Sequence, residues 1–259
     1  MKNTKLKHSA HILQKRSNTP ILIFLWFILI IYFTLVPAIP QDLNYHCFAG
    51  DEHSVGTIPH FLNVASNLFF CFAGLIGLYR LKNWAPSAMK TRWQIFYWGI
   101  FMVGVGSGYY HYHPTTLTLF WDRFPMAVSF IALVANFMAD RFDIFRRWSF
   151  FWLLLFLGAY STLSWILTEI WGRGDLRLYI LVQFGTMALV FLSLIKIPKP
   201  GDRAYWLLLG GYTLAKVFEM TDLPIYEITQ YWISGHVLKH LVAGLVLCLF
   251  FPKESQIKQ

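Results

Sequence analysis

The sequence of 259 residues has little charge: 14% of its residues are Asp, Glu, Lys or Arg, whereas 56% are hydrophobic. Soluble domains carry about 25% charged residues, so this composition excludes a soluble globular protein. The aromatic content of 19% also excludes a disordered chain, because such chains lack the apolar mass to form a core. The class that remains is an all-α membrane protein that crosses the bilayer several times.

Cysteine is scarce as well. The three cysteines, Cys47, Cys71 and Cys248, form no paired framework, so we predict neither a disulfide scaffold nor a cysteine-based zinc site. The net charge of +9 comes from short basic clusters that lie between apolar runs. This arrangement is typical of membrane topology and not of a phosphate-binding surface, so we expect no nucleic-acid partner.

Eight apolar runs are long enough to cross a bilayer, which takes about 17–25 residues. They are residues 20–39, 58–80, 93–113, 121–140, 148–168, 176–196, 204–220 and 230–251. A basic segment precedes the first run, but the run has no convincing signal-peptide cleavage site, which favours an uncleaved membrane helix. We therefore predict a basic tail over 1–19, an extra transmembrane helix with an outer loop over 20–57, and a seven-helix membrane domain over 58–252.

The basic residues predict how the chain is oriented. Most of the 22 Lys and Arg lie in the tail, at the carboxyl terminus and in the connectors after the second, fourth and sixth runs. These segments share one side of an alternating arrangement, and the positive-inside rule places that side and both termini in the cytoplasm. The opposite connectors contain acidic residues, namely Asp42, Asp51, Glu52, Glu169, Asp175, Asp222 and Glu227.

Histidine is distributed unevenly, since all the histidines beyond the tail lie in outer loops or in the outer halves of the runs. His236 and His240 are four residues apart, so both imidazoles project from one face of the last run. Ionisable groups at membrane depth are costly and are functional candidates by default. The alternative is a pair hydrogen-bonded to neighbouring helices. We expect His46 and His53, in a loop, to be solvated.

A second group lies around the third and fourth runs. His111 closes the third run, and Ser107 lies one turn earlier on the same face. Asp122 follows eleven residues after His111 and opens the next run, where an aspartate is often only a helix N-cap. Three neutral imidazoles with one open water position form a hydrolytic zinc site, and a carboxylate beside the water can take its proton. His111, His236 and His240 are therefore predicted zinc ligands, with Asp122 as the base.

Four short motifs resemble the alkaline ceramidase family, within the superfamily that also contains the adiponectin and progestin receptors. They are Asn63-x-x-Ser66-Asn67, Gly106-Ser107-x-x-x-His111, Asp122-x-x-Pro125-Met126 and Gly235-His236-x-x-x-His240. The resemblance covers about residues 58–251 and implies a seven-helix core. It also implies zinc held by the three histidines, Asp122 acting on the water, and Ser107 stabilising the oxyanion. The implied reaction is hydrolysis of the amide of a ceramide-like membrane lipid, giving a fatty acid and an amino lipid base.

Two departures from the family pattern stand out. His60 replaces a glutamate three residues before the motif asparagine, and Arg123 replaces an acidic residue after the motif aspartate. The family's amino-terminal acidic calcium motif also has no match in spacing among Asp42, Asn44, Asp51 and Glu52. The resemblance therefore does not extend to a calcium site.

Three alternatives remain open. The first is a non-enzymatic receptor or signalling protein of the same superfamily, in which the zinc is structural. The second is a haem protein with paired histidines, which gives Asp122 and Ser107 no role. The third is a proton-coupled transporter, suggested by Lys216, Glu219 and Lys239 inside the runs. For Lys216 and Glu219, an i, i+3 ion pair on one helix is the simpler account.

Overall fold

The computed structural model of the chain describes residues 31–50 and 53–253. Its described residues form helices, turns and loops, and their only strand-like feature is a bridge between Val55 and Ile58. The chain divides into two compact units, Met1–Ala38 and Ile39–Gln259. In the first unit, residues 31–35 are helical. The predicted basic tail and most of the predicted first transmembrane run lie outside the described residues.

The second unit is a bundle of helices. In chain order these are η1 (Leu43–His46), α3 (Phe61–Ala65), α4 (Leu68–Leu81), α5 (Ala88–Tyr112), α6 (Thr116–Ala139), η2 (Asp143–Arg146), α7 (Trp148–Ile170), α8 (Arg177–Ile180), a π-helical turn (Leu181–Gly185), α9 (Thr186–Lys196), α10 (Arg203–Met220), α11 (Asp222–Ile228) and α12 (Gly235–Leu249). The predicted runs from residue 58 onward each coincide with one of these helices, or with a consecutive pair such as α3 and α4.

Four helical segments are long and apolar enough to cross a membrane: Phe61–Leu81, Thr116–Ala139, Trp148–Ile170 and Arg177–Lys196. Many large apolar side chains also lie exposed on the outside of the bundle, among them Phe72, Trp98, Trp152, Phe156 and Leu192. A surface of this kind is stable against lipid and not against water. The chain is therefore an integral membrane protein.

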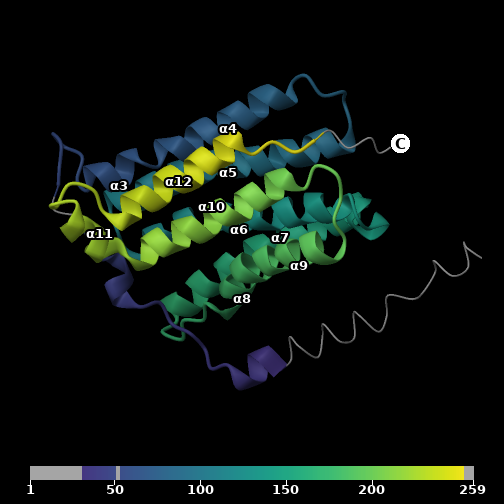
Figure 1. Cartoon of the computed structure of the whole chain (residues 1–259). Helices are drawn as coiled ribbons and strands as arrows, with labels where there is room; N and C mark the ends of the chain where they lie inside the picture. The colour runs from purple at the N-terminus through teal and green to yellow at the C-terminus, as the bar shows by residue number, and fades with distance from the viewer. Residues whose placement is uncertain (1–30, 51–52, 254–259) are drawn as a thin grey trace, which may run out of the picture. The chain divides into compact units, whose positions relative to one another are not determined.

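The helices of the second unit run side by side (Figure 1), and their contacts close into a ring. Each of α4, α5, α6 and α7 contacts the next, α9 contacts α6 and α10, and α12 contacts both α10 and α4. Large aromatic residues fill the core toward one end of the ring, including Trp93, Phe96, Tyr97, Phe137 and Phe250. The candidate functional residues lie toward the opposite end, between α5, α6, α10 and α12.

Helix ends follow local capping signals. The side chains of Ser87 and Ser234 accept hydrogen bonds from the backbone N–H three residues on, which begins α5 and α12. Thr115 and Thr118 form a reciprocal capping box that begins α6 at Thr116. The helix therefore begins earlier than residue 121, and the alternative that Asp122 is only an N-cap is wrong. Asp122 lies nearly two turns inside α6.

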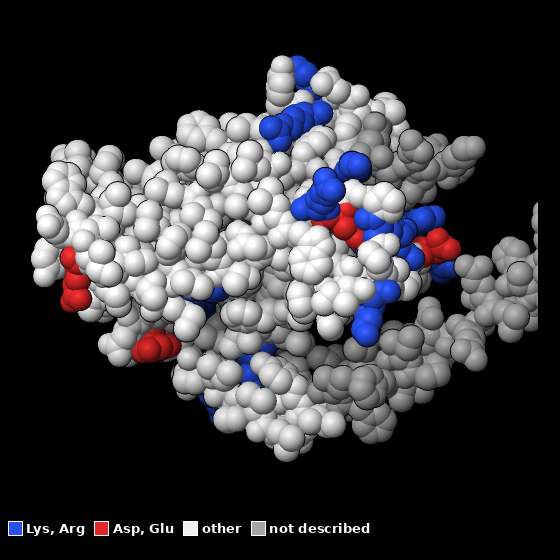
Figure 2. Space-filling view, in the orientation of Figure 1, with Lys and Arg blue, Asp and Glu red and all other residues white. Residues whose placement is uncertain are grey.

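The charged residues of the bundle gather at one end. Figure 2 shows most of the visible Lys and Arg at the end where the connectors α4–α5, α6–α7 and α9–α10 lie, whereas most of the remaining surface in this view is uncharged. At this end Arg141, after α6, forms an ion pair of 2.6 Å with Asp202, before α10. The candidate functional residues lie toward the other end of the helices.

Candidate metal centre and substrate cavity

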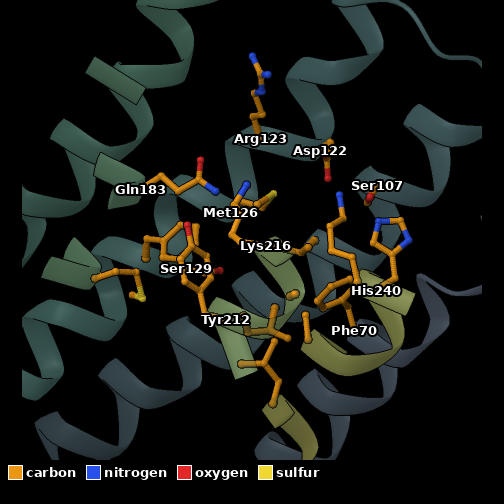
Figure 3. Close-up of a pocket in the computed structure, with 18 of the residues that line it drawn as sticks. Phe70, Ser107, Asp122, Arg123, Met126, Ser129, Gln183, Tyr212, Lys216 and His240 are labelled. Atoms are coloured by element: carbon orange, nitrogen blue, oxygen red, sulfur yellow. The ribbon is translucent and has the colours of Figure 1, made fainter. Parts of the chain in front are cut away.

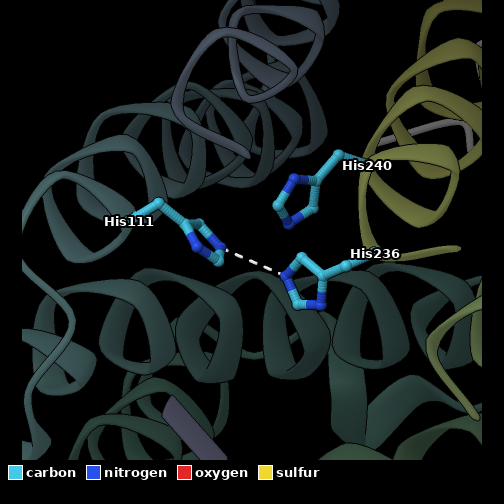
Figure 4. Close-up of side chains that lie close together, drawn as sticks. All are labelled: His111, His236 and His240. Atoms are coloured by element: carbon cyan, nitrogen blue, oxygen red, sulfur yellow. Dashed lines mark hydrogen bonds between the residues drawn. The ribbon is translucent and has the colours of Figure 1, made fainter. Parts of the chain in front are cut away.

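Three histidines from two helices converge in the interior. His111, from the last turn of α5, faces His236 and His240, from the first two turns of α12 (Figure 4). The Nε2 atoms of His111 and His236 are 3.2 Å apart, and one ring nitrogen from each of the three histidines lies within 4.8 Å of the others. All three side chains are at most 3% exposed. This group has the residue types and spacing to hold a metal ion.

Ser66 contacts the ring nitrogen of His240 that faces away from the other two histidines (Figure 4). The hydroxyl of Ser66 lies 3.2 Å from the carbonyl oxygen of Asn63 and 2.9 Å from Nδ1 of His240. When the hydroxyl donates its hydrogen to Asn63, it accepts the hydrogen of Nδ1, and Nε2 of His240 then has a free lone pair. A metal ligand held by a hydrogen bond on its other ring nitrogen is the usual arrangement. The donor set therefore fits a metal ion.

A loop from the start of the second unit covers the histidines. Phe48 packs against the rings of His111 and His236, with centroid distances of 4.9 and 4.1 Å. Asp222, at the start of α11, accepts hydrogen bonds from the backbone N–H of Ala49 at 2.9 Å and of His236 at 2.7 Å. A single carboxylate therefore fixes the covering loop and the first turn of α12 to one another.

Two glycines bring the helices around the site into close contact. A Cβ atom on Gly106 would lie 1.9 Å from the backbone oxygen of Trp121, so only glycine allows α5 to approach α6 this closely. A Cβ atom on Gly235 would lie 2.3 Å from the backbone oxygen of Phe218, so the start of α12 is equally close to α10. The first contact brings the side chain of Ser107 within hydrogen-bonding range of Asp122.

The site opens into a cavity of about 290 Å³. Ser107, Asp122 and His240 line one part of it (Figure 3). The same helices, followed toward the other end of the bundle, line the rest with apolar side chains: Phe96 and Ile100 from α5, Leu133 from α6, Leu208 from α10, and Val246 and Leu247 from α12. The cavity therefore has a polar layer at the histidines and an apolar layer that reaches about 10 Å further, seven residues along α12.

The polar layer also contains a charged cluster. Lys216 and Glu219 of α10 form the ion pair that their i, i+3 spacing predicts, and Lys239 of α12 joins it at 3.1 Å from Glu219. All three side chains line the cavity, so the pair does not lie on the lipid-facing side of α10. Gln183, from the π-helical turn, lines the cavity on the side opposite His240 (Figure 3), within hydrogen-bonding range of Tyr212.

Of the two loop histidines that are predicted to be solvated, His46 differs from the prediction. His46 is half-buried, with Nδ1 at 2.9 Å from the hydroxyl of Tyr110 and Nε2 at 3.1 Å from that of Thr116. Partial burial, together with the positive charge of Arg123, lowers the pKa of His46 below its usual value. His53 is exposed, yet its Nε2 lies 2.7 Å from the hydroxyl of Tyr226. Both histidines connect the loop to the bundle, but this packing withdraws only His46 from solvent, and His53 is exposed as predicted.

The positions that depart from the family pattern have local roles. Arg123 is buried, donates to Oε1 of Gln41 at 2.7 Å and lies 4.5 Å from the ring of Trp165. Asp42 accepts a hydrogen bond from the backbone N–H of Asn44 and caps η1. Asp51 and Glu52 are the other acidic residues that fail to match the calcium motif, and both lie outside the described residues.

The structure brings all five predicted site residues to one place: the three histidines form the cluster, and Ser107 and Asp122 line the adjoining cavity. Sequence reasoning did not find Phe48 or Asp222, because both act through contacts with distant segments. Ser66 belongs to the motif Asn63-x-x-Ser66-Asn67, but this motif did not predict a role for its hydroxyl. Lys239 was noted among the intramembrane charges, and the structure adds its bond to Glu219.

Fold and site together define a helical membrane protein in which three buried histidines, with the spacing to hold a metal ion, lie at the polar end of an amphipathic cavity. The family model described as Ceramidase matches residues 54–203, more than half of the chain, and the chain belongs to this family. The matched region contains Ser107, His111 and Asp122, whereas His236 and His240 lie beyond it. No match was found among the curated proteins. Family membership indicates a hydrolase that acts on a lipid amide.

Proposed function

We propose that the protein is a zinc-dependent intramembrane hydrolase of a ceramide-like lipid amide, which releases a fatty acid and an amino lipid base. One observation carries the proposal: three buried histidines converge at the polar end of a cavity whose other end is apolar. Such a cavity suits a substrate with a long acyl chain and a polar group at the bond to be cleaved. Membership of the ceramidase family supports the same reaction class.

The three histidines are the proposed zinc ligands. Their Nε2 atoms are the ones available, since Nδ1 of His240 is bonded to Ser66 and the Nε2 atoms of His111 and His236 face one another. Three histidine ligands leave a fourth, open position, which is the arrangement of a catalytic zinc site. When bound there, zinc polarises the amide carbonyl and lowers the pKa of a water molecule toward about 7.

Asp122 is the proposed general base. It accepts the proton of the attacking water and passes it to the leaving amine nitrogen, a role that is typically worth about 10²–10⁴-fold. The other carboxylate that lines the cavity, Glu219, is held by two lysines and is therefore not available for this role. Ser107, beside Asp122, donates its hydroxyl hydrogen to the carbonyl oxygen as negative charge develops on that atom.

We place the second unit in the membrane with seven crossings, preceded by one more helix in the first unit. The crossings are α3–α4, α5, α6, α7, α8–α9, α10 and α12. The gathering of Lys and Arg at the end away from the histidines supports cytoplasmic termini and a site that faces the exterior or the periplasm. A cysteine in the connector 113–115 should then react with an impermeant reagent in intact cells, and labelling of the α6–α7 connector instead would reverse the orientation.

The experiment that tests the function is hydrolysis of a fluorescent ceramide by the purified full-length protein, with metal analysis of the same sample. We expect about one zinc per chain, turnover that a chelator abolishes, and loss of both metal and turnover in His236→Ala and His240→Ala.

His113→Ala is the matched control, because His113 is an exposed histidine two residues from His111. This variant should keep the metal and the activity of the wild type. Full zinc occupancy in the double variant of His236 and His240 would refute the ligand assignment. Zinc binding without turnover of any lipid amide would instead favour the receptor alternative.

A further inference from the structure

Two lysines in the polar layer of the cavity share one carboxylate. The ammonium groups of Lys216 and Lys239 both donate to Glu219, one to each carboxylate oxygen. The side chains of the three residues are between 19% and 30% exposed, and all three line the cavity. A single carboxylate therefore serves two ammonium groups, each of which has further hydrogens to donate.

Arg123 also lines the cavity, but its guanidinium group points away from the other labelled side chains (Figure 3), toward Gln41. Its hydrogen-bond partner is the neutral amide of Gln41, and its other contacts are with aromatic rings. Besides Glu219, the cavity is lined by one carboxylate, that of Asp122. The charges inside the cavity are therefore two lysines and two carboxylates, and the lysines still have ammonium hydrogens to donate to a bound group.

The layered cavity fixes where a substrate's two halves lie. Its apolar layer accepts the acyl chain, and the amide bond then lies at Ser107, Asp122 and the histidines. The group attached to the amide nitrogen is left in the polar layer, beside Lys216 and Lys239. An anionic group there accepts charge-assisted hydrogen bonds from the two lysines, and these are stronger than the hydrogen bonds that a neutral hydroxyl accepts.

We propose that Lys216 and Lys239 bind an anionic group on the amine half of the substrate, so that the protein prefers acyl amides whose amine carries a carboxylate or a phosphate. Glu219 holds the two lysines in place and partly offsets their charge. This inference rests on the proposed function, since it concerns the selectivity of the same site.

The test compares two substrates with the same acyl chain, one the amide of glycine and the other the amide of ethanolamine. Both are offered to the purified full-length protein in detergent micelles, with a ceramide as the reference substrate. Hydrogen bonds to a charged group predict a kcat/KM about 10- to 100-fold higher for the glycine amide. A lower KM for the glycine amide should account for most of the difference.

Two variants should move this preference in opposite directions. Lys216→Gln removes one cation and should reduce the ratio of the two kcat/KM values at least several-fold, whereas Lys216→Arg keeps the charge and should retain it. Glu219→Gln removes the offsetting carboxylate and should raise the ratio. A merely structural role of the cluster predicts that Lys216→Gln and Glu219→Gln lower both activities alike. Lys196→Gln, at the exposed end of α9, is the control and should match the wild type.

The outcomes separate this inference from the proposed function. Hydrolysis of ceramide or of the ethanolamine amide at a rate equal to or above that of the glycine amide overturns the inference and leaves the proposed function standing. Inhibition by free fatty acid that depends on Lys216, without a preference for the glycine amide, also overturns it, because the lysines then bind the acyl carboxylate. No hydrolysis of any of the three overturns both. If the variants do not fold, the ratio of the two kcat/KM values in the wild-type protein still tests the inference.

Discussion

Replacing Gly106 by alanine should separate α5 from α6 at the point where they hold Ser107 beside Asp122. The added Cβ atom would lie 1.9 Å from the backbone oxygen of Trp121, whereas ordinary contacts of this kind begin at 3.4 Å. The obstacle is backbone, which cannot rotate away as a side chain can, so the helices must move apart by more than about 1 Å. Overpacking of this kind costs about 1–3 kcal/mol.

Gly108 offers a matched control on the same helix. The nearest heavy atoms to a Cβ atom there are at 4.0 Å, so alanine fits without any movement. Replacing a glycine by alanine in a helix interior stabilises the folded state by about 0.5–1 kcal/mol. The two substitutions, two residues apart, are therefore expected to change stability in opposite directions.

Thermal unfolding in detergent measures the difference, at about 2–4 °C per kcal/mol for a chain of this size. Gly106→Ala should lower the Tm and also reduce lipid-amide turnover, because Ser107 and Asp122 move apart. Gly108→Ala should raise the Tm slightly and leave turnover unchanged. Equal shifts in the two variants, or wild-type stability in Gly106→Ala, would refute the close contact of the two helices.

Three further predictions concern single side chains. Asp122→Asn should retain the metal and lower kcat by about 10²–10⁴-fold, since the amide cannot accept the proton; loss of the metal would make Asp122 a ligand. Ser66→Ala removes the partner of Nδ1 of His240 and should weaken metal affinity about 10- to 100-fold in a chelator competition, and an unchanged affinity would contradict its role. His46 has a lowered pKa, because burial and Arg123 favour its neutral form, so its contribution to stability is present above about pH 6.5 and is lost as the pH falls below that value. His46→Gln should therefore lower the Tm more at pH 8 than at pH 5.5, and equal shifts at both pH values would show that His46 does not titrate in this way.

The helices and the histidine cluster were predictable because their signals are local. Apolar runs bounded by charged connectors gave the positions of the helices from residue 58 onward to within a few residues for most of them. The i, i+4 spacing of His236 and His240 needs only helix geometry to place both rings on one face. The prediction that these residues meet His111 rested on their common depth in the membrane, which is a long-range inference but a simple one.

The parts that were missed depend on contacts between distant segments. Asp222 joins the covering loop to the start of α12, and nothing in its own neighbourhood of the sequence indicates either partner. His46 was expected in solvent because a loop histidine usually is, and its bonds to Tyr110 and Thr116 depend on how the loop folds back. The start of α6, by contrast, was predictable from a local signal, because Thr115 and Thr118 have the spacing of a capping box.

The distribution of the histidines along the chain has a consequence for biosynthesis. Ser107, His111 and Asp122 lie on one helical hairpin, α5–α6, which can form as soon as it enters the membrane. His236 is 125 residues further along than His111, on the helix that closes the ring by packing against both α4 and α10. Because membrane segments are made in order from the amino terminus, the proposed metal centre is completed only by the helix that completes the bundle. Metal occupancy would therefore report that a newly made molecule has assembled, since a nascent chain interrupted before α12 lacks two of the three proposed ligands.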